Sequence, residues 1–248
     1  PNLLSANQKL FLRSYLGLLP STNTTLRKVV PKIHLHRPEL RDNYANNRYC
    51  YIDFETANNY IYLIGVVYRD ASTEEHFRYF QAPTLDRAGE LQVTNSLLRF
   101  LANRADAILV HWSSAEISNL RNVSSRNQGS GERGTRATRR IVMSLDSLLR
   151  DKTKWLDLEK VFREHNLVLP GMHSFKLKDV VGCLHGTGHI DVQYSADELN
   201  CMNGLEASRQ GLAYYRIFSE LTRDPMPDII KYNRIDCLVL SRIMSLFG

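Results

Sequence analysis

The sequence lacks the features of membrane-spanning and secreted proteins. No apolar run approaches the roughly 20 residues that cross a bilayer, and the first residues contain no basic segment followed by an apolar one. The 4 cysteines form no Cys-x-x-Cys pair and lie among apolar residues, as is typical of reduced thiols. We therefore expect a soluble intracellular protein, cytoplasmic or nuclear, that is not secreted and contacts no membrane.

The sequence also lacks a strong excess of either charge. Its 32 Lys and Arg residues stand against 26 Asp and Glu residues, which gives a net charge of +6. If several acids gather around metal ions, the remaining surface is more basic than this balance suggests, as suits a protein that binds phosphate groups. A hydrophobic content of 43% in 248 residues is sufficient for a sizeable core.

Two acids interrupt the apolar segment Tyr51–Thr56, which otherwise has the composition of a buried strand. Because side chains alternate across a strand, Asp53 and Glu55 point to the same face and repel each other. A divalent cation such as Mg²⁺ would neutralise both carboxylates. The alternative is an edge strand whose acids face water.

A helix is predicted from the prolines at 225 and 227 to Phe247. Tyr232 and Asp236 lie one turn apart on its apolar face, where an ionised carboxylate needs a partner or a metal ion. In the simpler alternative, Asp236 accepts a hydrogen bond from a neighbouring hydroxyl group.

A third acid, Glu116, follows a predicted strand at Ala107–Trp112, at the start of a helix. Ligand sites in α/β proteins commonly lie where a strand leads into a helix. The spacing from Ser113 also fits a capping box, in which Glu116 accepts the backbone N–H of Ser113. If Glu116 is a cap, Asp157 and Asp179 are the alternative metal ligands.

Together these acidic segments resemble the signature of the DEDD 3′–5′ exonucleases. Tyr232, four residues before Asp236, is typical of the DEDDy branch, whereas the histidine branch would have histidine in place of Lys231. The sequence resembles more closely the ribonuclease H-like domain of predicted RecB-family nucleases, from Tyr49 to Phe247. One departure is Glu116, where the exonucleases usually have aspartate. The further matching segments are Tyr62–Val66, Trp155–Leu158, Ser174–Asp179 and Asn203–Ala207.

The resemblance implies a ribonuclease H-like α/β fold, in which helices flank a mixed sheet made of an antiparallel meander and parallel strands. It implies a metal-dependent 3′–5′ exonuclease that hydrolyses phosphodiester bonds, with DNA favoured over RNA, using two Mg²⁺ or Mn²⁺ ions. Asp53, Glu55, Glu116 and Asp236 would hold the ions. Tyr232 would orient the attacking water, because the ordinary pKa of tyrosine is too high for a base at neutral pH.

Two other classes of function stay open at this point. A structure-selective endonuclease would have the same acids, and a catalytically silent nucleic-acid-binding module would have the same fold. The expected partner is nucleic acid, as a single strand or a 3′ end. The chain is also compatible with being part of a larger nuclease or helicase polypeptide or complex.

The predicted organisation has two parts: residues 1–48 form a helical and basic extension, and residues 49–248 form the ribonuclease H-like exonuclease domain. Within the domain, strands at 49–56, 60–68 and 76–80 are expected to form the meander, followed by a helix at 91–104.

A segment rich in Arg, Ser and Gly, residues 121–140, is predicted to be a flexible basic loop near the site. Its arginines are candidates to contact the phosphate backbone, together with a lysine that follows Ser174. The candidates are Arg126, Arg133, Arg136, Arg139 and Lys176.

Overall fold

The computed structural model describes residues 5–128, 135–195, 199–217 and 221–248. Helices precede the first strand: α1 (Ala6–Tyr15), α2 (Thr22–His36) and α3 (Glu39–Ala45). The helix α1 begins at Ser5, whose hydroxyl accepts the backbone N–H of Gln8 in a capping box. None of the described helices combines the length and the apolar character needed to cross a membrane.

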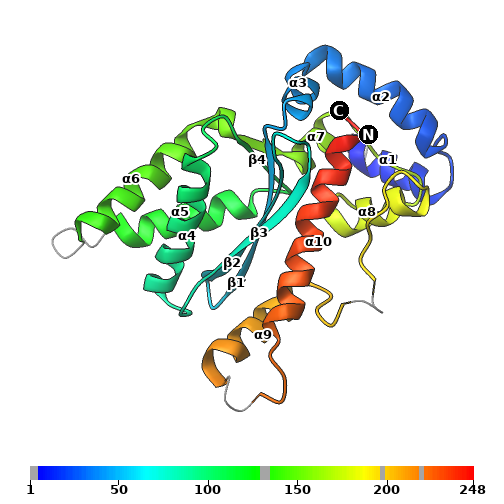
Figure 1. Cartoon of the computed structure of the whole chain (residues 1–248). Helices are drawn as coiled ribbons and strands as arrows, with labels where there is room; N and C mark the ends of the chain where they lie inside the picture. Colours follow the sequence, from blue (N-terminus) through cyan, green and yellow to red (C-terminus); the bar gives the residue numbers. More distant parts are fainter. Residues whose placement is uncertain (1–4, 129–134, 196–198, 218–220) are drawn as a thin grey trace.

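A mixed sheet of five strands, in the order β3-β2-β1-β4-β5, forms the centre of the molecule (Figure 1). β1 lies in the middle, antiparallel to β2 and parallel to β4. This arrangement confirms the predicted α/β fold, with a meander on one side of β1 and parallel strands on the other. The strands are β1 (Tyr49–Ala57), β2 (Tyr60–Arg69), β3 (Glu75–Gln81), β4 (Ile108–His111) and β5 (Trp155–Asp157).

Helices cover both faces of the sheet. In Figure 1, α4, α5 and α6 lie to the left of the strands, whereas α10 crosses the opposite face and α9 lies below it. The helices after β3 are α4 (Arg87–Ala102), α5 (Ala115–Gln128), α6 (Arg136–Arg150), α7 (Leu158–Glu164), α8 (Leu177–Gly186), α9 (Gly204–Ile217) and α10 (Met226–Ser245).

The composition of β2 follows from this layering. Residues 61–67 of this strand are buried without interruption, because α4 packs on one face of β2 and α10 on the other. A strand covered on both faces has a continuous apolar run instead of an alternating one. The apolar sequence Ile61–Val67 therefore belongs to a strand in the middle of three layers.

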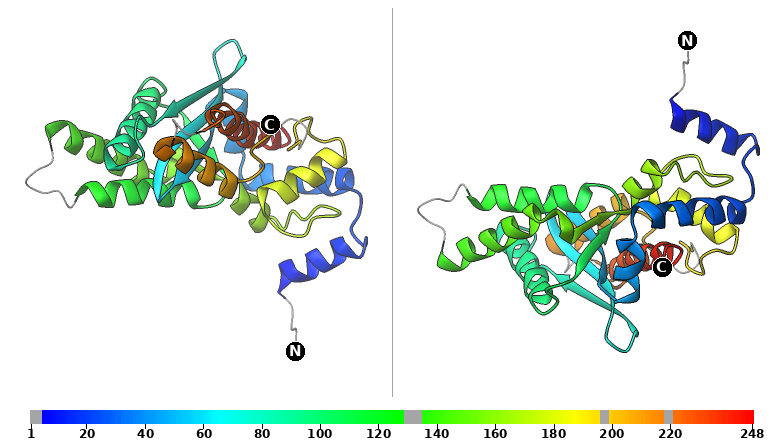
Figure 2. Two further views of the ribbon diagram at one scale, coloured as in Figure 1. Left: turned by 90° about the horizontal axis from the view of Figure 1, so that it is seen from below. Right: turned by 90° about the horizontal axis from the view of Figure 1, so that it is seen from above.

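The N-terminal helices contact the rest of the molecule through buried side chains. Ile33 of α2 is fully buried, and His34 Nε2 lies 2.5 Å from the carbonyl oxygen of Phe247. The hydroxyl of Ser14 donates to the carbonyl of Leu169 over 2.9 Å. Figure 2 shows α2 alongside α8, with α1 at the edge of the molecule.

The predicted loop at 121–140 is wrong over most of its length. Residues 121–128 are the second half of α5 and residues 136–140 are the first turns of α6, so the two helices form a hairpin. Arg133 lies outside the described residues. The sequence suggested a loop because Ser, Asn and Thr are poor helix formers, but packing of the two helices against each other overrides these weak propensities.

Arg126, which the sequence suggested as a phosphate contact, is instead part of a buried ion pair. Its guanidinium donates to both carboxylate oxygens of Glu90, at 2.6 and 2.7 Å, and Glu90 has no exposed surface. Glu90 also accepts the backbone N–H of Ile61 over 2.9 Å. The pair therefore ties together α4, α5 and the start of β2.

Replacing Arg126 with Ala should destabilise the protein, because Glu90 then stays buried without its charge partner. Loss of one partner from a buried pair typically lowers the free energy of unfolding by about 3–5 kcal/mol, and the partial exposure of Arg126 places this case toward the lower end. Urea denaturation measures the change. The control is Arg139→Ala, an exposed arginine of α6, which should change stability by less than about 0.5 kcal/mol. Equal stability of the two variants would contradict a structural role for the pair.

Candidate metal centre

Three carboxylates converge where α10 crosses β1. Asp53 and Glu55 lie on the same face of β1, and Asp236 lies on the side of α10 that faces the sheet. One oxygen of each group lies within 4.8 Å of the other two. Glu55 and Asp236 are buried, with 4% and 6% of their surfaces exposed. The two acidic segments are therefore brought together by the packing of α10 on the sheet.

Gly65 of β2 permits this close approach. It pairs with Asp53 in the antiparallel register, and a β-carbon at Gly65 would stand 1.8 Å from Oδ1 of Asn233 on α10. No rearrangement short of moving Asn233 would relieve such an overlap. The glycine thus allows α10 to reach the middle of the sheet.

Asn233 holds Asp53 in place. Its Nδ2 donates to Asp53 Oδ2 over 2.7 Å and to the backbone carbonyl of Asp53 over 3.1 Å. Asn233 is fully buried, which is unusual for an asparagine. Sequence analysis assigned no role to Asn233, although it lies between Tyr232 and Asp236 on the predicted helix.

Two tyrosines contact Asp236. The hydroxyl of Tyr194 donates to Asp236 Oδ1, and the hydroxyl of Tyr232 also forms a hydrogen bond with this carboxylate. Lys178 Nζ lies 4.8 Å from the ring centre of Tyr194 and 5.0 Å from that of Tyr232. Tyr194 was not anticipated, because it lies 42 residues before Asp236 in a segment without periodic pattern.

Glu116 lies at the same cavity, but it is not a helix cap. The backbone N–H of Ser113 donates to Asp157 Oδ1 over 3.2 Å, so the capping-box partner of Glu116 is already taken. Glu116 is 6% exposed, and its Oε2 lies 3.6 Å from Nδ1 of the buried His111. The alternative ligands are also engaged elsewhere. Asp157 caps α7 by accepting the backbone N–H of Lys160, and Asp179 accepts a hydrogen bond from the hydroxyl of Ser174.

A small cavity opens over these acids. Its volume is about 260 Å³, and it lies beside the indole of Trp112 and the start of α8. The lining includes Lys176, the exposed N-cap residue of α8, whose backbone N–H donates to the hydroxyl of Ser174. The other lining residues are Ile52, Asp53, Glu116, Leu177, Lys178, Tyr194, Tyr232, Asp236 and Leu240.

Burial raises the pKa of each converging carboxyl group. Burial, followed by repulsion from Asp236, raises the pKa of Asp53 well above its ordinary value. Burial raises the pKa of Glu55 to about 8, and repulsion from Asp236 adds to this effect. Burial raises the pKa of Asp236 to about 6, although the hydroxyls of Tyr194 and Tyr232 lower it. The cluster therefore favours protons or cations at neutral pH.

These residues fit a divalent metal ion. Among the described side chains, Oε1 of Glu55 and Oε2 of Glu116 are buried and have no hydrogen-bond partner, so each has lone pairs to offer. Carboxylate oxygens are the ligands that Mg²⁺ and Mn²⁺ prefer. Asp53, Glu55 and Asp236 would hold the cation, with Glu116 available at the same cavity.

A second acidic group does not fit as well. Asp70, Glu74 and His76 lie close together at the β2–β3 turn, where they are partly or fully exposed. Asp70 Oδ1 already accepts three hydrogen bonds from residues 72 and 74, and Oδ2 lies 2.8 Å from His76 Nε2. The hydroxyl of Ser72, followed by His76, lowers the pKa of Asp70 to about 2. The turn is thus explained by its internal contacts.

The arginines of α6 lie apart from the acidic cluster. Arg136 and Arg139 are exposed in the first turns of α6, at the opposite end of the hairpin from Glu116. At 1.5 Å per residue, the 14-residue helix α5 that separates them is about 20 Å long. In Figure 1, α5 and α6 extend away from α10.

The stability of the metal-free protein should fall as the pH rises. Glu55 has an ordinary pKa of 4.5 but about 8 in the folded protein, so the folded state binds the proton more tightly. Between these values the folded state carries more protons than the unfolded state, and its stability therefore decreases with increasing pH. Thermal unfolding in EDTA from pH 5 to pH 8 measures this decline, which should amount to several degrees.

Two comparisons isolate the contribution of Glu55 to the fall in stability with pH. Glu55→Gln should flatten the decline, whereas Glu164→Gln, at an exposed position on α7, should leave it unchanged. Added Mn²⁺ should stabilise the wild type more at pH 8 than at pH 5, since it replaces the proton. If the midpoint of thermal unfolding of the wild type rises with pH in EDTA, the raised pKa of Glu55 in the folded protein is contradicted.

Comparison with known proteins gives one match. A family described as the RNase_H superfamily matches residues 50–247 of the chain. No curated protein and no solved structure matches it. The matched range begins in β1 and ends just after α10, so it includes the mixed sheet and all five predicted site residues.

Proposed function

The chain belongs to the RNase H superfamily, and from this premise we propose that it is a metal-dependent 3′–5′ exonuclease. The observation that carries the proposal is the convergence of Asp53, Glu55 and Asp236 within 4.8 Å, with an unpartnered oxygen on Glu55. A protein that only binds nucleic acid has no use for buried acids that repel phosphate. DNA is the favoured substrate, and the likeness to DEDDy exonucleases and RecB-family domains is part of this proposal.

Two Mg²⁺ or Mn²⁺ ions would supply an activated water and would stabilise the charge that develops on the leaving oxygen. The protein holds Asp53 through Asn233 and Asp236 through two tyrosine hydroxyls. These partners fix the direction of the carboxylate oxygens before substrate arrives, which lowers the reorganisation needed during the reaction.

Tyr232 acts as a hydrogen-bond donor. Burial, followed by the charge of Asp236, raises the pKa of Tyr232 above its ordinary value, so the hydroxyl keeps its proton at neutral pH. Because this proton is directed at Asp236, the hydroxyl oxygen accepts a hydrogen bond from the attacking water and orients it without deprotonating it. The ring of Tyr232 packs beside Tyr194 and keeps the hydroxyl near Asp236.

The lining of the cavity supports action on a terminal nucleotide. Its volume of about 260 Å³ lies just below the range of roughly 300–1,000 Å³ typical of small-molecule sites, so it has room for a single small group. Trp112 offers an aromatic surface to a base, and Lys176 and Lys178 offer positive charge to a phosphate. A strand that leaves the cavity toward the α5–α6 hairpin would meet Arg136 and Arg139, which we propose as further phosphate contacts.

The reaction is tested with strands labelled at the 5′ or 3′ end, of DNA and RNA, in Mg²⁺ and in Mn²⁺. We expect 5′-mononucleotides released stepwise from a 3′-hydroxyl end, resistance of closed circles, and loss of turnover in Asp53→Asn. Cleavage of circles would instead indicate an endonuclease. Absence of cleavage with either metal would indicate a binding module.

Tyr232→Phe should lower kcat with little change in KM. The ring packing survives, but the hydroxyl that contacts Asp236 is lost, and such outer contacts are typically worth roughly 10- to 100-fold in activity. Steady-state kinetics on a labelled single strand measures both constants. The control is Tyr79→Phe, an exposed tyrosine of β3, which should behave as the wild type. A change confined to KM would assign Tyr232 to substrate binding.

Replacing Arg136 and Arg139 with Ser should weaken the salt dependence of strand binding. Each phosphate contact on single-stranded DNA contributes roughly 0.7 to the slope of log affinity against log salt, so two lost contacts reduce it by about 1.4. Affinity is measured by fluorescence anisotropy at several salt concentrations. The double variant Arg27→Ser with Lys28→Ser removes the same charge from α2 and should leave the slope unchanged. Equal slopes in both variants would contradict contact at α6.

A further inference from the structure

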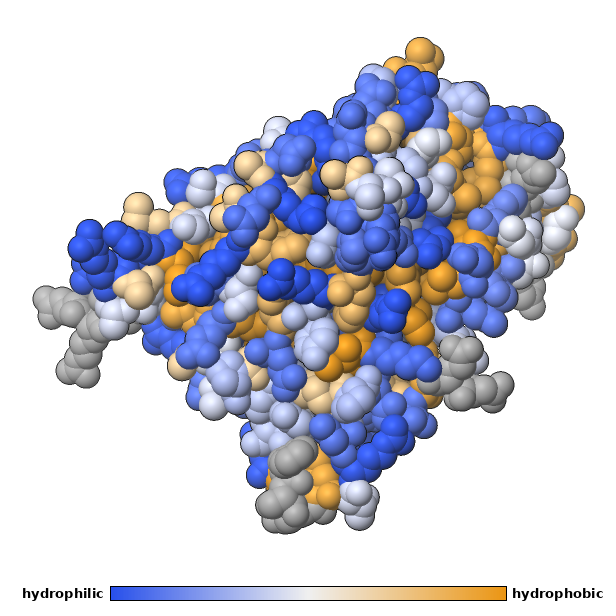
Figure 3. All heavy atoms as spheres, in the orientation of Figure 1, coloured by the Kyte–Doolittle hydropathy of each residue, from blue (hydrophilic) through white to orange (hydrophobic). Residues whose placement is uncertain are grey.

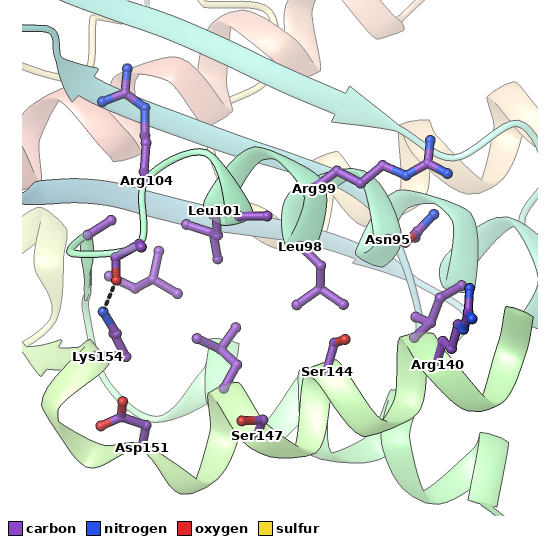
Figure 4. A pocket seen from close by; sticks show the side chains of 16 residues that line it. Asn95, Leu98, Arg99, Leu101, Arg104, Arg140, Ser144, Ser147, Asp151 and Lys154 are labelled. Atoms are coloured by element: carbon purple, nitrogen blue, oxygen red, sulfur yellow. Dashed lines mark hydrogen bonds between the residues drawn. The ribbon is translucent and has the colours of Figure 1, made fainter.

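A second and larger cavity lies between α4 and α6, on the other face of the sheet from α10. Its volume is about 440 Å³, within the range of roughly 300–1,000 Å³ for small-molecule sites. It shares no lining residue with the cavity over the acidic cluster. Figure 4 shows that its walls come from two helices that rest on the same sheet.

The inner surface of this cavity is apolar. Hydrophobic side chains from α4, β4 and α6 form it, and Figure 3 shows hydrophobic atoms among hydrophilic ones on this side of the molecule. Such a surface accommodates a flat or aliphatic body that is driven out of water. The side chains are Leu98, Leu101, Leu109, Ile141 and Leu148.

Polar groups interrupt the apolar surface. Asn95, Ser144 and Ser147 point at the cavity from its two helices (Figure 4). Ser144 and Ser147 are exposed and Asn95 is half-buried, and within the described residues none of the three side chains has a protein hydrogen-bond partner. A purely aliphatic ligand that covered them would displace their water without replacing its hydrogen bonds, whereas the edge of a nucleobase presents both donors and acceptors.

Positive charge lies at both ends of the cavity. Arg99 of α4 and Arg140 of α6 lie toward the end where α6 begins, and Arg104, Lys154 and Asp151 lie at the other end (Figure 4). In the described part of the chain, neither Arg99 nor Arg140 forms an ion pair. At the far end, Lys154 donates to a backbone carbonyl and Asp151 accepts hydrogen bonds from Thr153, so both are engaged. Arg104 is held over the ring of Tyr68, with its guanidinium carbon 4.0 Å from the ring centre. Arg99 and Arg140 are thus the arginines that we assign to an anion.

We propose that the α4–α6 cavity binds a nucleoside 5′-monophosphate. Arg99 and Arg140 hold the phosphate, because a guanidinium group binds phosphate oxygens through charge-assisted hydrogen bonds. The base lies on the leucines, with its edge toward Ser144 and Ser147. This inference goes beyond the proposed function, since binding here requires neither metal nor catalysis. If the protein is an exonuclease, the ligand is its own product class, and the cavity is a second site for it.

Isothermal titration with adenosine 5′-monophosphate, in EDTA, tests the proposal on the whole chain. We expect binding to the wild type and to Asp53→Asn alike, because the acidic cluster is not involved. Arg140→Glu should weaken binding by about tenfold or more, because charge-assisted hydrogen bonds to phosphate are strong. Ser144→Trp should do the same by filling the cavity.

Matched variants at positions of α6 outside the cavity serve as controls. Arg150→Glu makes the same charge change at an exposed arginine of α6 that does not line the cavity, and Met143→Trp adds the same indole next to Ser144 at a side chain that is 70% exposed. Both should bind the nucleotide as the wild type does. Equal loss of nucleotide binding in the control variants, or its loss in Asp53→Asn, would overturn the placement of the nucleotide in the α4–α6 cavity. Wild type that binds no nucleotide would overturn the site itself.

Two further probes test the ligand class. Inorganic phosphate should bind at least about tenfold more weakly than the nucleotide, since it lacks the apolar body that the leucines cover. Octanoate should also bind more weakly, because it leaves the serines and Asn95 unsatisfied. Phosphate that binds as well as the nucleotide, or octanoate that binds better, would overturn the assignment. These outcomes are independent of the labelled-strand assay, so either proposal can fail alone.

Discussion

The close contact of α10 with the middle of the sheet is the constraint on which the rest of the structure depends. Gly65 has no side chain, and only for this reason can Asn233 lie over β2 and donate to Asp53 on the neighbouring strand. The same contact sets the depth at which Asp236 meets Asp53 and Glu55. A single methyl group at Gly65 would thus displace the side chain of Asn233, which holds Asp53 in place.

This contact creates an electrostatic conflict that the surrounding side chains only partly relieve. Carboxylates buried beside each other are unfavourable as anions, and burial raises the pKa of Glu55 to about 8. Hydroxyl groups on Tyr194 and Tyr232 favour the ionised form of Asp236, whereas Oε1 of Glu55 has no partner among the described residues. Proteins keep such unresolved groups mainly where a ligand completes them, which is consistent with a metal centre.

Local patterns in the sequence were sufficient for the sheet and for the acidic segments. The strands around Asp53 and the C-terminal helix were predicted because alternation of side chains and the helical period depend only on neighbouring residues. The mixed character of the sheet, a meander plus parallel strands, followed from the resemblance to a known fold, whereas the order of the strands came from the structure. The structure also contains the short strand β5 at Trp155–Asp157.

By itself, the sequence determined which residues carry the acids and on which strand or helix face each acid lies, because these properties are local. Only the tertiary structure decided which residues the charged side chains contact. Arg126 was indistinguishable from a phosphate contact until α5 placed it against Glu90. Glu116 matched a helix cap until Ser113 donated to Asp157 instead. Such pairings join residues tens of positions apart, and their geometry depends on how helices pack on the sheet, which no local pattern encodes.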